Sequence, residues 1–303
     1  MQFLYILEKL RRPGLNEFAL LVTHLGEEAA FLAAALLVFW CVDKNRGYYL
    51  MVVGFIGTML GQFLKLLFRV PRPWILDENF TILEQAREAA TGYSFPSGHS
   101  LTAVGTFGAI AATARTKWLR YGCIAVSVLV PFSRMYLGVH TPADVLAGSA
   151  IALALVFLLR PMAGDGWERR MKAILVVMLF MALCLLAFIT YWPFPLDVDS
   201  HNLESGIKNG YTMLGCVAGV MVVYPAERKY VNFETKACWW AQILKVFMGL
   251  LTVLLVKEGL RGPLETVLPY GLARTVRYFL VVLTAGLVWP MSFRWFSKLG
   301  ERK

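Results

Sequence analysis

Charged side chains are scarce in this sequence. Asp, Glu, Lys and Arg make up only 17% of its 303 residues, whereas 58% are hydrophobic and the mean hydropathy is +0.58. This composition excludes a water-soluble domain of ordinary size. Instead, many apolar runs approach the roughly 20 residues that cross a bilayer. They fall at about 27–42, 48–68, 100–114, 118–138, 143–160, 173–192, 207–224, 238–256 and 273–292, and they predict eight or nine spans.

The sequence also lacks paired cysteine motifs and a cleavable leader. Its five cysteines lie inside or at the ends of apolar runs without CxxC spacing, so we interpret them as packing residues. The N-terminal segment has no basic start and no small-residue cleavage site. Its short apolar blocks are split at residues 9–13, which predicts an interfacial helix or a partial span.

Basic residues collect in alternate loops, at residues 44–46, 115–120, 160–172, 228–236 and 294–303. The positive-inside rule assigns these loops to the cytoplasm. The opposite loops carry acidic residues, within 77–88 and 197–204. The net charge of +10 is therefore a topology signal, and we expect no nucleic-acid partner.

Three polar clusters interrupt the apolar pattern on the predicted non-cytoplasmic side. The first is KLLFRVPRP, where Lys65, Arg69 and Arg72 recur at spacings of four and three. This spacing predicts one helical face that ends at Pro71 and Pro73. Three cations on one face repel each other unless an anion lies between them. The alternative is that they snorkel from the end of a span.

The second cluster is SFPSGHS, just before an apolar run. A helix that begins near Gly98 leaves the amides of Ser97, Gly98 and His99 without intrahelical partners, and its dipole adds positive charge there. Such an end binds anions. We expect Ser97 to donate its hydroxyl, Gly98 to allow close approach, and His99 to face the anion. The alternative is a simple N-cap followed by an interfacial histidine.

The third cluster is SRMYLGVHTPADVLAG. Arg134 ends one run, and Thr141, Pro142 and Asp144 start the next helix, with Thr141 as N-cap. A capping box therefore explains Asp144. The same carboxylate follows His140 by four residues, about one helical turn, where it could accept the proton of one imidazole nitrogen and raise the basicity of the other. The two roles are compatible.

Together the clusters supply what phosphoryl transfer needs. Lys65, Arg72, Arg134 and helix amides can hold the phosphoryl oxygens, and in-line displacement needs a histidine on each side of phosphorus. Magnesium would require several carboxylates at the site, but the clusters contain only Asp144. We therefore predict a reaction without a metal or another cofactor.

The clusters resemble the signature of the type-2 phosphatidic acid phosphatase superfamily, which spans lipid phosphate phosphatases, glucose-6-phosphatase and vanadium haloperoxidases. Its motifs have the forms K-x6-R-P, P-S-G-H and S-R-x5-H-x3-D. All three occur here in order and at the family's spacing, within about residues 25–160. The matching residues are Lys65, Arg72 and Pro73; Pro96, Ser97, Gly98 and His99; and Ser133, Arg134, His140 and Asp144.

This resemblance implies an all-α, polytopic transmembrane helical bundle. The phosphatase core would comprise residues 1–162, and residues 163–303 would form an extension of about four further helices. By position, His140 would attack phosphorus to give a phosphohistidine, Asp144 would orient it, and His99 would protonate the leaving alkoxide and then activate water. The phosphoryl oxygens would be held by Lys65, Arg72, Ser97, Gly98 and Arg134.

A site at the membrane surface favours a substrate with its phosphate at head-group level and its tail in lipid. Polyprenyl (pyro)phosphates, phosphatidate, phosphatidylglycerol phosphate and sphingoid phosphates all satisfy this condition. The alternatives are a soluble sugar phosphate, such as glucose 6-phosphate, and a transporter or lipid flippase in which the clusters bind an anion. We expect a multi-pass protein of a bacterial cytoplasmic membrane, with the site on its non-cytoplasmic face; an ER membrane obeys the same loop-charge rule.

Three polar residues lie outside the motifs. His24 and Glu27 are expected on the outer face near the site, where an interfacial polar patch is favoured over contact with a substrate head group. Lys245 interrupts an apolar run and is a functional candidate for that reason. It could also snorkel or pair with a carboxylate.

Overall fold

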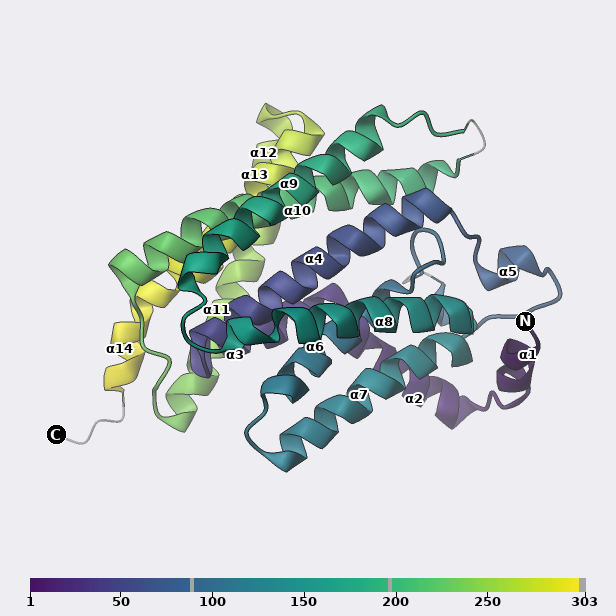
Figure 1. The fold of residues 1–303 in the computed structure, drawn as a ribbon, viewed down its shortest axis with the longest axis horizontal. Coiled ribbons are helices and arrows are strands. Elements are labelled where there is room, and N and C mark those ends of the chain that lie inside the picture. The colour runs from purple at the N-terminus through teal and green to yellow at the C-terminus, as the bar shows by residue number, and fades with distance from the viewer. Residues whose placement is uncertain (88–89, 196–197, 300–303) are drawn as a thin grey trace. The chain divides into compact units, whose positions relative to one another are not determined.

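The computed structural model describes residues 1–87, 90–195 and 198–299. These residues form helices and no strand, which confirms the predicted all-α polytopic bundle (Figure 1). Every predicted apolar run coincides with a helix. The longer helices are α1 Gln2–Lys9, α2 Pro13–Thr23, α3 Glu28–Cys41, α4 Lys44–Phe68, α6 Gly98–Thr113, α7 Lys117–Tyr136, α8 Pro142–Leu159, α9 Glu168–Tyr191, α10 Ser200–Ala226, α11 Trp239–Gly259 and α13 Tyr270–Leu283. Short helices are η1 His24–Gly26, α5 Pro73–Leu76, η2 Glu84–Ala86, η3 Arg160–Ala163, η4 Glu227–Val231, α12 Arg261–Val267, η5 Thr284–Val288, η6 Pro290–Ser292 and α14 Phe293–Lys298.

Fewer helices than expected meet the length and apolarity of a membrane span. Six of the described helices do so, or seven if Pro13–Gly26 and Glu28–Cys41, bent by 55°, count as one broken span. The sequence predicted eight or nine. Helix α6 coincides with a predicted run but has only 16 residues, about 24 Å at the α-helical rise against a hydrocarbon core of about 30 Å.

The chain divides into two compact units. Unit 1 comprises residues 1–34, 49–163 and 194–206, and unit 2 comprises residues 35–48, 164–193 and those from 207 on. All three motif clusters belong to unit 1. The domain boundary predicted at residue 162 stays a prediction.

Unit 1 is built around α6, which packs against both α7 and α8, while α1 and α2 pack against α7. Helix α4 approaches α6 through a glycine: a Cβ on Gly57 would lie 2.5 Å from the side chain of Leu101. The Tyr49 hydroxyl donates to the Val156 carbonyl at 2.6 Å and links α4 to α8. These contacts hold the N-terminal ends of α6 and α8 near the C-terminal end of α4.

In unit 2, α10 packs against α9 and α13 through small residues. A Cβ on Gly215 would lie only 2.3 Å from the Thr275 carbonyl oxygen. The predicted candidate Lys245 is fully buried and donates to the carbonyls of Trp40, at 2.9 Å, and Thr235, at 3.0 Å. It therefore neither snorkels nor pairs with a carboxylate, and it instead binds a carbonyl in the last turn of α3.

Candidate active site

Lys65 and Arg72 come from two sides of a helix break. Helix α4 ends at Phe68, Lys65 lies in its last turn, and Arg72 is the N-cap of α5. Arg69 has left the helix, with φ of 50°. The prediction of three cations on one helical face was therefore wrong. Arg69 instead lines a cavity of about 590 Å³ together with Phe68, Pro71, Arg72, Ile75, Gly92, Tyr93, Pro195, Val198, Asp199 and Asn202.

Backbone carbonyls hold both cations in place. Lys65 Nζ donates to the Tyr93 carbonyl. Arg72 donates through Nε to Gly92 at 3.0 Å, through NH2 to Thr91 at 2.8 Å and through NH1 to Val139 at 2.9 Å. Both side chains are buried, and neither carries a carboxylate partner among these hydrogen bonds. Neutral carbonyl groups thus hold both side chains near the site.

The PSGH segment begins α6 as the sequence predicts. Ser97 is the N-cap, and its Oγ accepts from the Ser100 amide at 3.4 Å and from the Ser100 hydroxyl at 2.9 Å. The Ser97 amide donates to the Asp144 carbonyl at 3.0 Å, which joins the start of α6 to that of α8. This junction requires a glycine on α8, because a Cβ on Gly148 would lie 2.6 Å from the Ser97 carbonyl oxygen.

One ring nitrogen of His99, which lies in the first turn of α6, is shielded from solvent. Its Nε2 is inaccessible to solvent and has no hydrogen-bond partner among the described residues. The Cβ and backbone of His99 lie against η1, since a Cβ on Gly26 would be 3.1 Å from both the Cβ and the carbonyl oxygen of His99. His99 is therefore fixed from one side while its Nε2 remains available.

Arg134 is fully buried in the last turn of α7. Its NH1 donates to the Thr23 hydroxyl at 2.7 Å, whereas its Nε and NH2 have no partner among the described residues. Buried donors are nearly always satisfied in native proteins, so these two atoms are candidates to donate to a bound acceptor. Sequence analysis missed Thr23, and no local signal connects it with a residue more than a hundred positions away.

The relation between His140 and Asp144 differs from the predicted one. The capping box is present: Asp144 Oδ2 accepts from the Thr141 amide at 2.7 Å, and the Thr141 hydroxyl accepts from the Asp144 amide at 3.3 Å. His140 precedes the helix, and its Nδ1 lies 3.7 Å from Asp144 Oδ2, too far for a hydrogen bond.

Ser94 fills this gap. Its Oγ donates to Asp144 Oδ2 at 2.7 Å and lies 3.4 Å from His140 Nδ1, and the side chain is fully buried. Arg72 NH1 lies 2.9 Å from Nε2 and 3.5 Å from Nδ1 of the same ring. Because the single hydroxyl proton of Ser94 goes to Asp144, the Ser94 oxygen can only accept from Nδ1, which favours the tautomer with the proton on Nδ1. Ser94 is the first residue of the SFPSGHS segment, but the sequence alone did not indicate this role for it.

The surroundings of His140 keep its imidazole neutral. Burial holds the pKa of His140 well below its usual range, and the positive charges of Arg72, Arg134 and Lys65 lower it further. His99 also acts electrostatically on His140, so the two imidazoles share one environment. A neutral imidazole with a defined tautomer has a lone pair on Nε2 with which to attack an electrophile.

The structure thus places all the predicted site residues in unit 1, where Lys65, Arg72, Arg134 and His99 all interact electrostatically with His140. The cluster combines buried cations, a helix N-terminus and two histidines. No group of three or more His, Cys, Asp or Glu side chains suited to a metal ion occurs in the described part of the chain. Chemically, such a cluster can bind a tetrahedral oxyanion and attack its central atom.

Family models match both parts of the chain. The model of the PAP2 superfamily matches residues 46–168. A second model, described as PAP2 superfamily phosphatase, transmembrane extension, matches residues 211–302. The first match covers all three motif clusters, and the second covers helices from α10 to α14.

Curated relatives agree with these models. Undecaprenyl-diphosphatase of Sulfolobus acidocaldarius is 32% identical over 145 residues, covering 48% of this chain and 68% of that protein. Phosphatidylglycerophosphatase B of Bacillus subtilis is 30% identical over 175 residues, covering 54% and 80%. Sphingosine-1-phosphate phosphatase 1 of Rattus norvegicus is 26% identical over 258 residues, covering 78% and 57%. No solved structure matches the chain. These matches confirm the predicted resemblance and the prediction of a multi-pass membrane phosphatase.

Proposed function

The chain belongs to the PAP2 superfamily, and from this premise we propose that it hydrolyses a lipid phosphate at the membrane surface, through a phosphohistidine on His140 and without a metal. One observation carries the proposal. The neutral His140 ring lies beside Arg72, in a unit where Arg134 Nε, Arg134 NH2 and His99 Nε2 are buried and have no hydrogen-bond partner among the described residues. A phosphoryl group bound beside His140 would offer acceptors to the Arg134 donors and a leaving oxygen to His99.

The first step is in-line displacement at phosphorus. His140 Nε2 forms a bond to phosphorus while the bond from phosphorus to the ester oxygen breaks, and His99 transfers a proton to that oxygen. Burial and the neighbouring cations hold the pKa of His99 well below its usual range, so the negative charge of the bound phosphate is needed to keep His99 protonated before this transfer. Arg72 is well suited to hold an equatorial oxygen beside Nε2, since its NH1 already lies 2.9 Å from that atom. Arg134, Lys65 and the amides at the start of α6 stabilise the charge on the other oxygens.

In the second step, His99 acts as a base instead of an acid. Neutral His99 accepts a proton from water, the hydroxyl oxygen bonds to phosphorus, and the bond between phosphorus and His140 Nε2 breaks. Phosphate leaves and both rings return to their starting states. Ser94 and Asp144 act on Nδ1 throughout, because they favour the tautomer that leaves the lone pair on Nε2.

Two features favour a lipid substrate over a soluble sugar phosphate. The site residues lie at the ends of α4, α6, α7 and α8, and α4 and α8 are apolar enough to cross a membrane. A phosphate at head-group level would therefore reach the site while its tail stays in lipid. The curated names of the relatives point the same way, to undecaprenyl diphosphate, phosphatidylglycerophosphate and sphingosine 1-phosphate. Loop charge supports the non-cytoplasmic face of a bacterial cytoplasmic membrane as the location.

Phosphate release by purified protein in detergent tests the proposal. Over a panel of lipid phosphates and glucose 6-phosphate, we expect activity on lipids that His140→Ala abolishes and EDTA does not affect. His99→Ala should accumulate a ³²P-labelled, acid-labile phosphoenzyme and should slow poor leaving groups most. Vanadate should inhibit the unmodified protein.

Retention of activity in His140→Ala would contradict the nucleophile. An equal loss for good and poor leaving groups in His99→Ala would contradict the general acid. Loss of activity in EDTA with recovery on adding a divalent metal would contradict metal independence.

A further inference from the structure

In unit 1, the apolar helices α2 and α3 are separated by a short polar segment, residues 23–28, which we call the break. Helix α2 ends at Thr23, the short helix η1 covers His24–Gly26, and α3 starts at Glu28, with a bend of 55°. Irregular backbone at such a position is tolerated where it faces protein or a polar cavity. The break is flanked by exposed apolar side chains, including Leu21, Leu25 and Leu32. The proposed mechanism uses none of its polar side chains.

Two of these polar side chains form a fixed pair. His24 Nδ1 lies 2.7 Å from Glu27 Oε1, so the imidazole donates to the carboxylate. The pair is accessible, with 64% of the His24 side chain and 36% of the Glu27 side chain exposed. One carboxylate oxygen of Glu27 is therefore held by His24, while the side chain as a whole can still reach a bound molecule.

The pair adjoins the leaving-group side of the candidate site. Gly26, between the two residues, packs against His99, and Thr23 binds Arg134 NH1 at 2.7 Å. The charge of Glu27 acts on Arg134 and that of His24 acts on His99. The break thus borders both the proposed general acid and a proposed phosphate-binding side chain.

The geometry of in-line displacement indicates which part of the substrate would lie beside the break. The nucleophile and the leaving group are on opposite sides of phosphorus. If His140 attacks, the alcohol departs on the side of His99. Gly26 of the break lies against His99 and Thr23 binds Arg134, so the carbons nearest the ester oxygen would lie close to the break and to His24 and Glu27.

We infer that Glu27, held by His24, is a specificity-determining residue that accepts a hydrogen bond from the leaving alcohol and selects phosphomonoesters of amino alcohols over pyrophosphates. This inference rests on the proposed function. A carboxylate there attracts an ammonium group on the carbon next to the phosphoester. It repels a second phosphate, which in a pyrophosphate would occupy the same place. The exposed leucines around the break suit the hydrocarbon tail of such a substrate.

The test compares three substrates in the same detergent micelles: sphingosine 1-phosphate, phosphatidate and farnesyl pyrophosphate. The quantity measured is the ratio of kcat/KM for sphingosine 1-phosphate to kcat/KM for each of the others. Glu27→Gln should lower both ratios by about tenfold or more, because a hydrogen bond between two charged groups is lost. His24→Ala should lower them in the same direction by about threefold, since Glu27 loses its fixed orientation.

Glu28→Gln is the matched control, since it removes the same charge one residue further along the exposed start of α3. Glu28→Gln should give the same two kcat/KM ratios as the unmodified protein. Vanadate inhibition separates specificity from damage to the phosphate site: its strength should be kept in Glu27→Gln. Unchanged ratios in Glu27→Gln, or a fall shared by Glu28→Gln, would overturn the inference. Failure of the proposed function would be visible separately, as hydrolysis of these substrates that persists in His140→Ala.

Discussion

Ser94 connects two groups that sequence spacing alone would pair directly. The four-residue separation of His140 and Asp144 predicts contact over one helical turn, but His140 lies outside α8 and the two side chains are 3.7 Å apart. The hydroxyl of Ser94 donates to the carboxylate and lies 3.4 Å from Nδ1 of the ring. We therefore propose that Asp144 acts on the ring mainly through Ser94, with Ser94 as a positioning residue.

We predict that Ser94→Ala lowers kcat/KM by about tenfold, the effect of losing one buried hydrogen bond in the transition state. The rate of phosphoenzyme formation should fall while vanadate inhibition keeps its strength, because the phosphate-binding groups are untouched. A purely structural role would weaken both. Ser127→Ala is the control: this serine also makes a hydrogen bond, to the Cys123 carbonyl at 2.9 Å within α7.

Helix ends carry the site, and their close approach depends on one small residue. Gly148 on α8 faces the backbone at Ser97, where a Cβ would be 2.6 Å from the carbonyl oxygen. Backbone atoms cannot move aside as a flexible side chain would. A larger residue would therefore push the start of α6 away from that of α8 and break the hydrogen bond between the Ser97 amide and the Asp144 carbonyl.

Gly148→Ala should thus reduce kcat/KM by at least tenfold and destabilise the fold by about 1–3 kcal/mol, as overpacking does. Thermal unfolding in detergent and phosphate release measure the two effects. Gly122→Ala on α7 is the contrasting variant, since its new methyl group would meet no atom within 4 Å. Alanine is the better helix former, so this variant should be as stable as the unmodified protein or more so. A similar response of the two variants would contradict the role of close packing.

The sequence predicts these elements better than it predicts their contacts. Apolar runs identify the helices, and motif spacing identifies Lys65, His99 and His140, because both signals are local. Arg69 was misplaced because periodicity does not reveal that α4 stops at Phe68. Thr23 and Ser94 were missed because their partners lie far away along the chain, and only the packing of helices brings such residues together.

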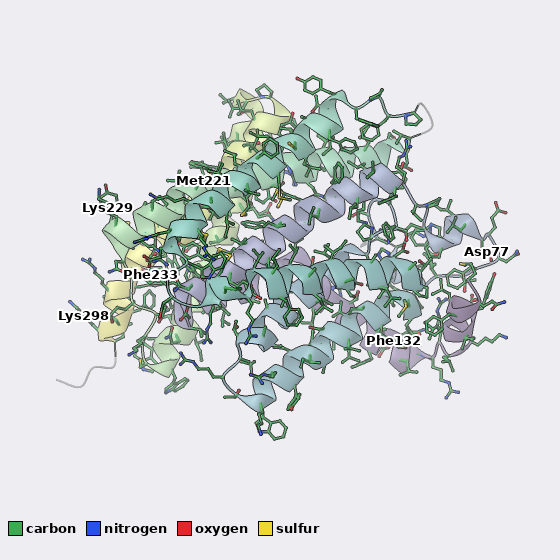
Figure 2. The ribbon with its side chains drawn as sticks, viewed as in Figure 1. Asp77, Phe132, Met221, Lys229, Phe233 and Lys298 are labelled. Atoms are coloured by element: carbon green, nitrogen blue, oxygen red, sulfur yellow. The ribbon has the colours of Figure 1, made fainter. Side chains whose placement is uncertain are left out.

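At the scale of the whole molecule, the distribution of charge predicts how the chain is oriented in the bilayer. Lys229 and Lys298 project from one end of unit 2 (Figure 2), in loops and short helices that the positive-inside rule assigns to the cytoplasm. The loop after α5, which includes Asp77, carries acidic side chains instead. Only the four residues of α5 separate this loop from Arg72, so the side of the membrane on which the loop lies indicates the face on which the site opens.

Cysteine labelling tests this orientation. In a chain whose five cysteines are replaced by alanine, Asn79→Cys should react with a membrane-impermeant maleimide in intact cells. Lys229→Cys should react only after the cells are permeabilised. Both residues are exposed, so a difference in labelling reports the side of the membrane. The reverse pattern would contradict a non-cytoplasmic site.

The segment 194–206 has a consequence for attempts to shorten the protein. Although it follows α9 of unit 2 in the chain, it belongs to unit 1, where a Cβ on Gly206 would be 2.7 Å from Leu66 and where Val198 and Asn202 line the cavity beside Arg69. A chain truncated after η3 would keep all three motifs but would lose the residues of this segment that line the cavity. We therefore expect that an N-terminal fragment containing only the motifs would lack part of unit 1, since residues after α9 in the chain belong to that unit.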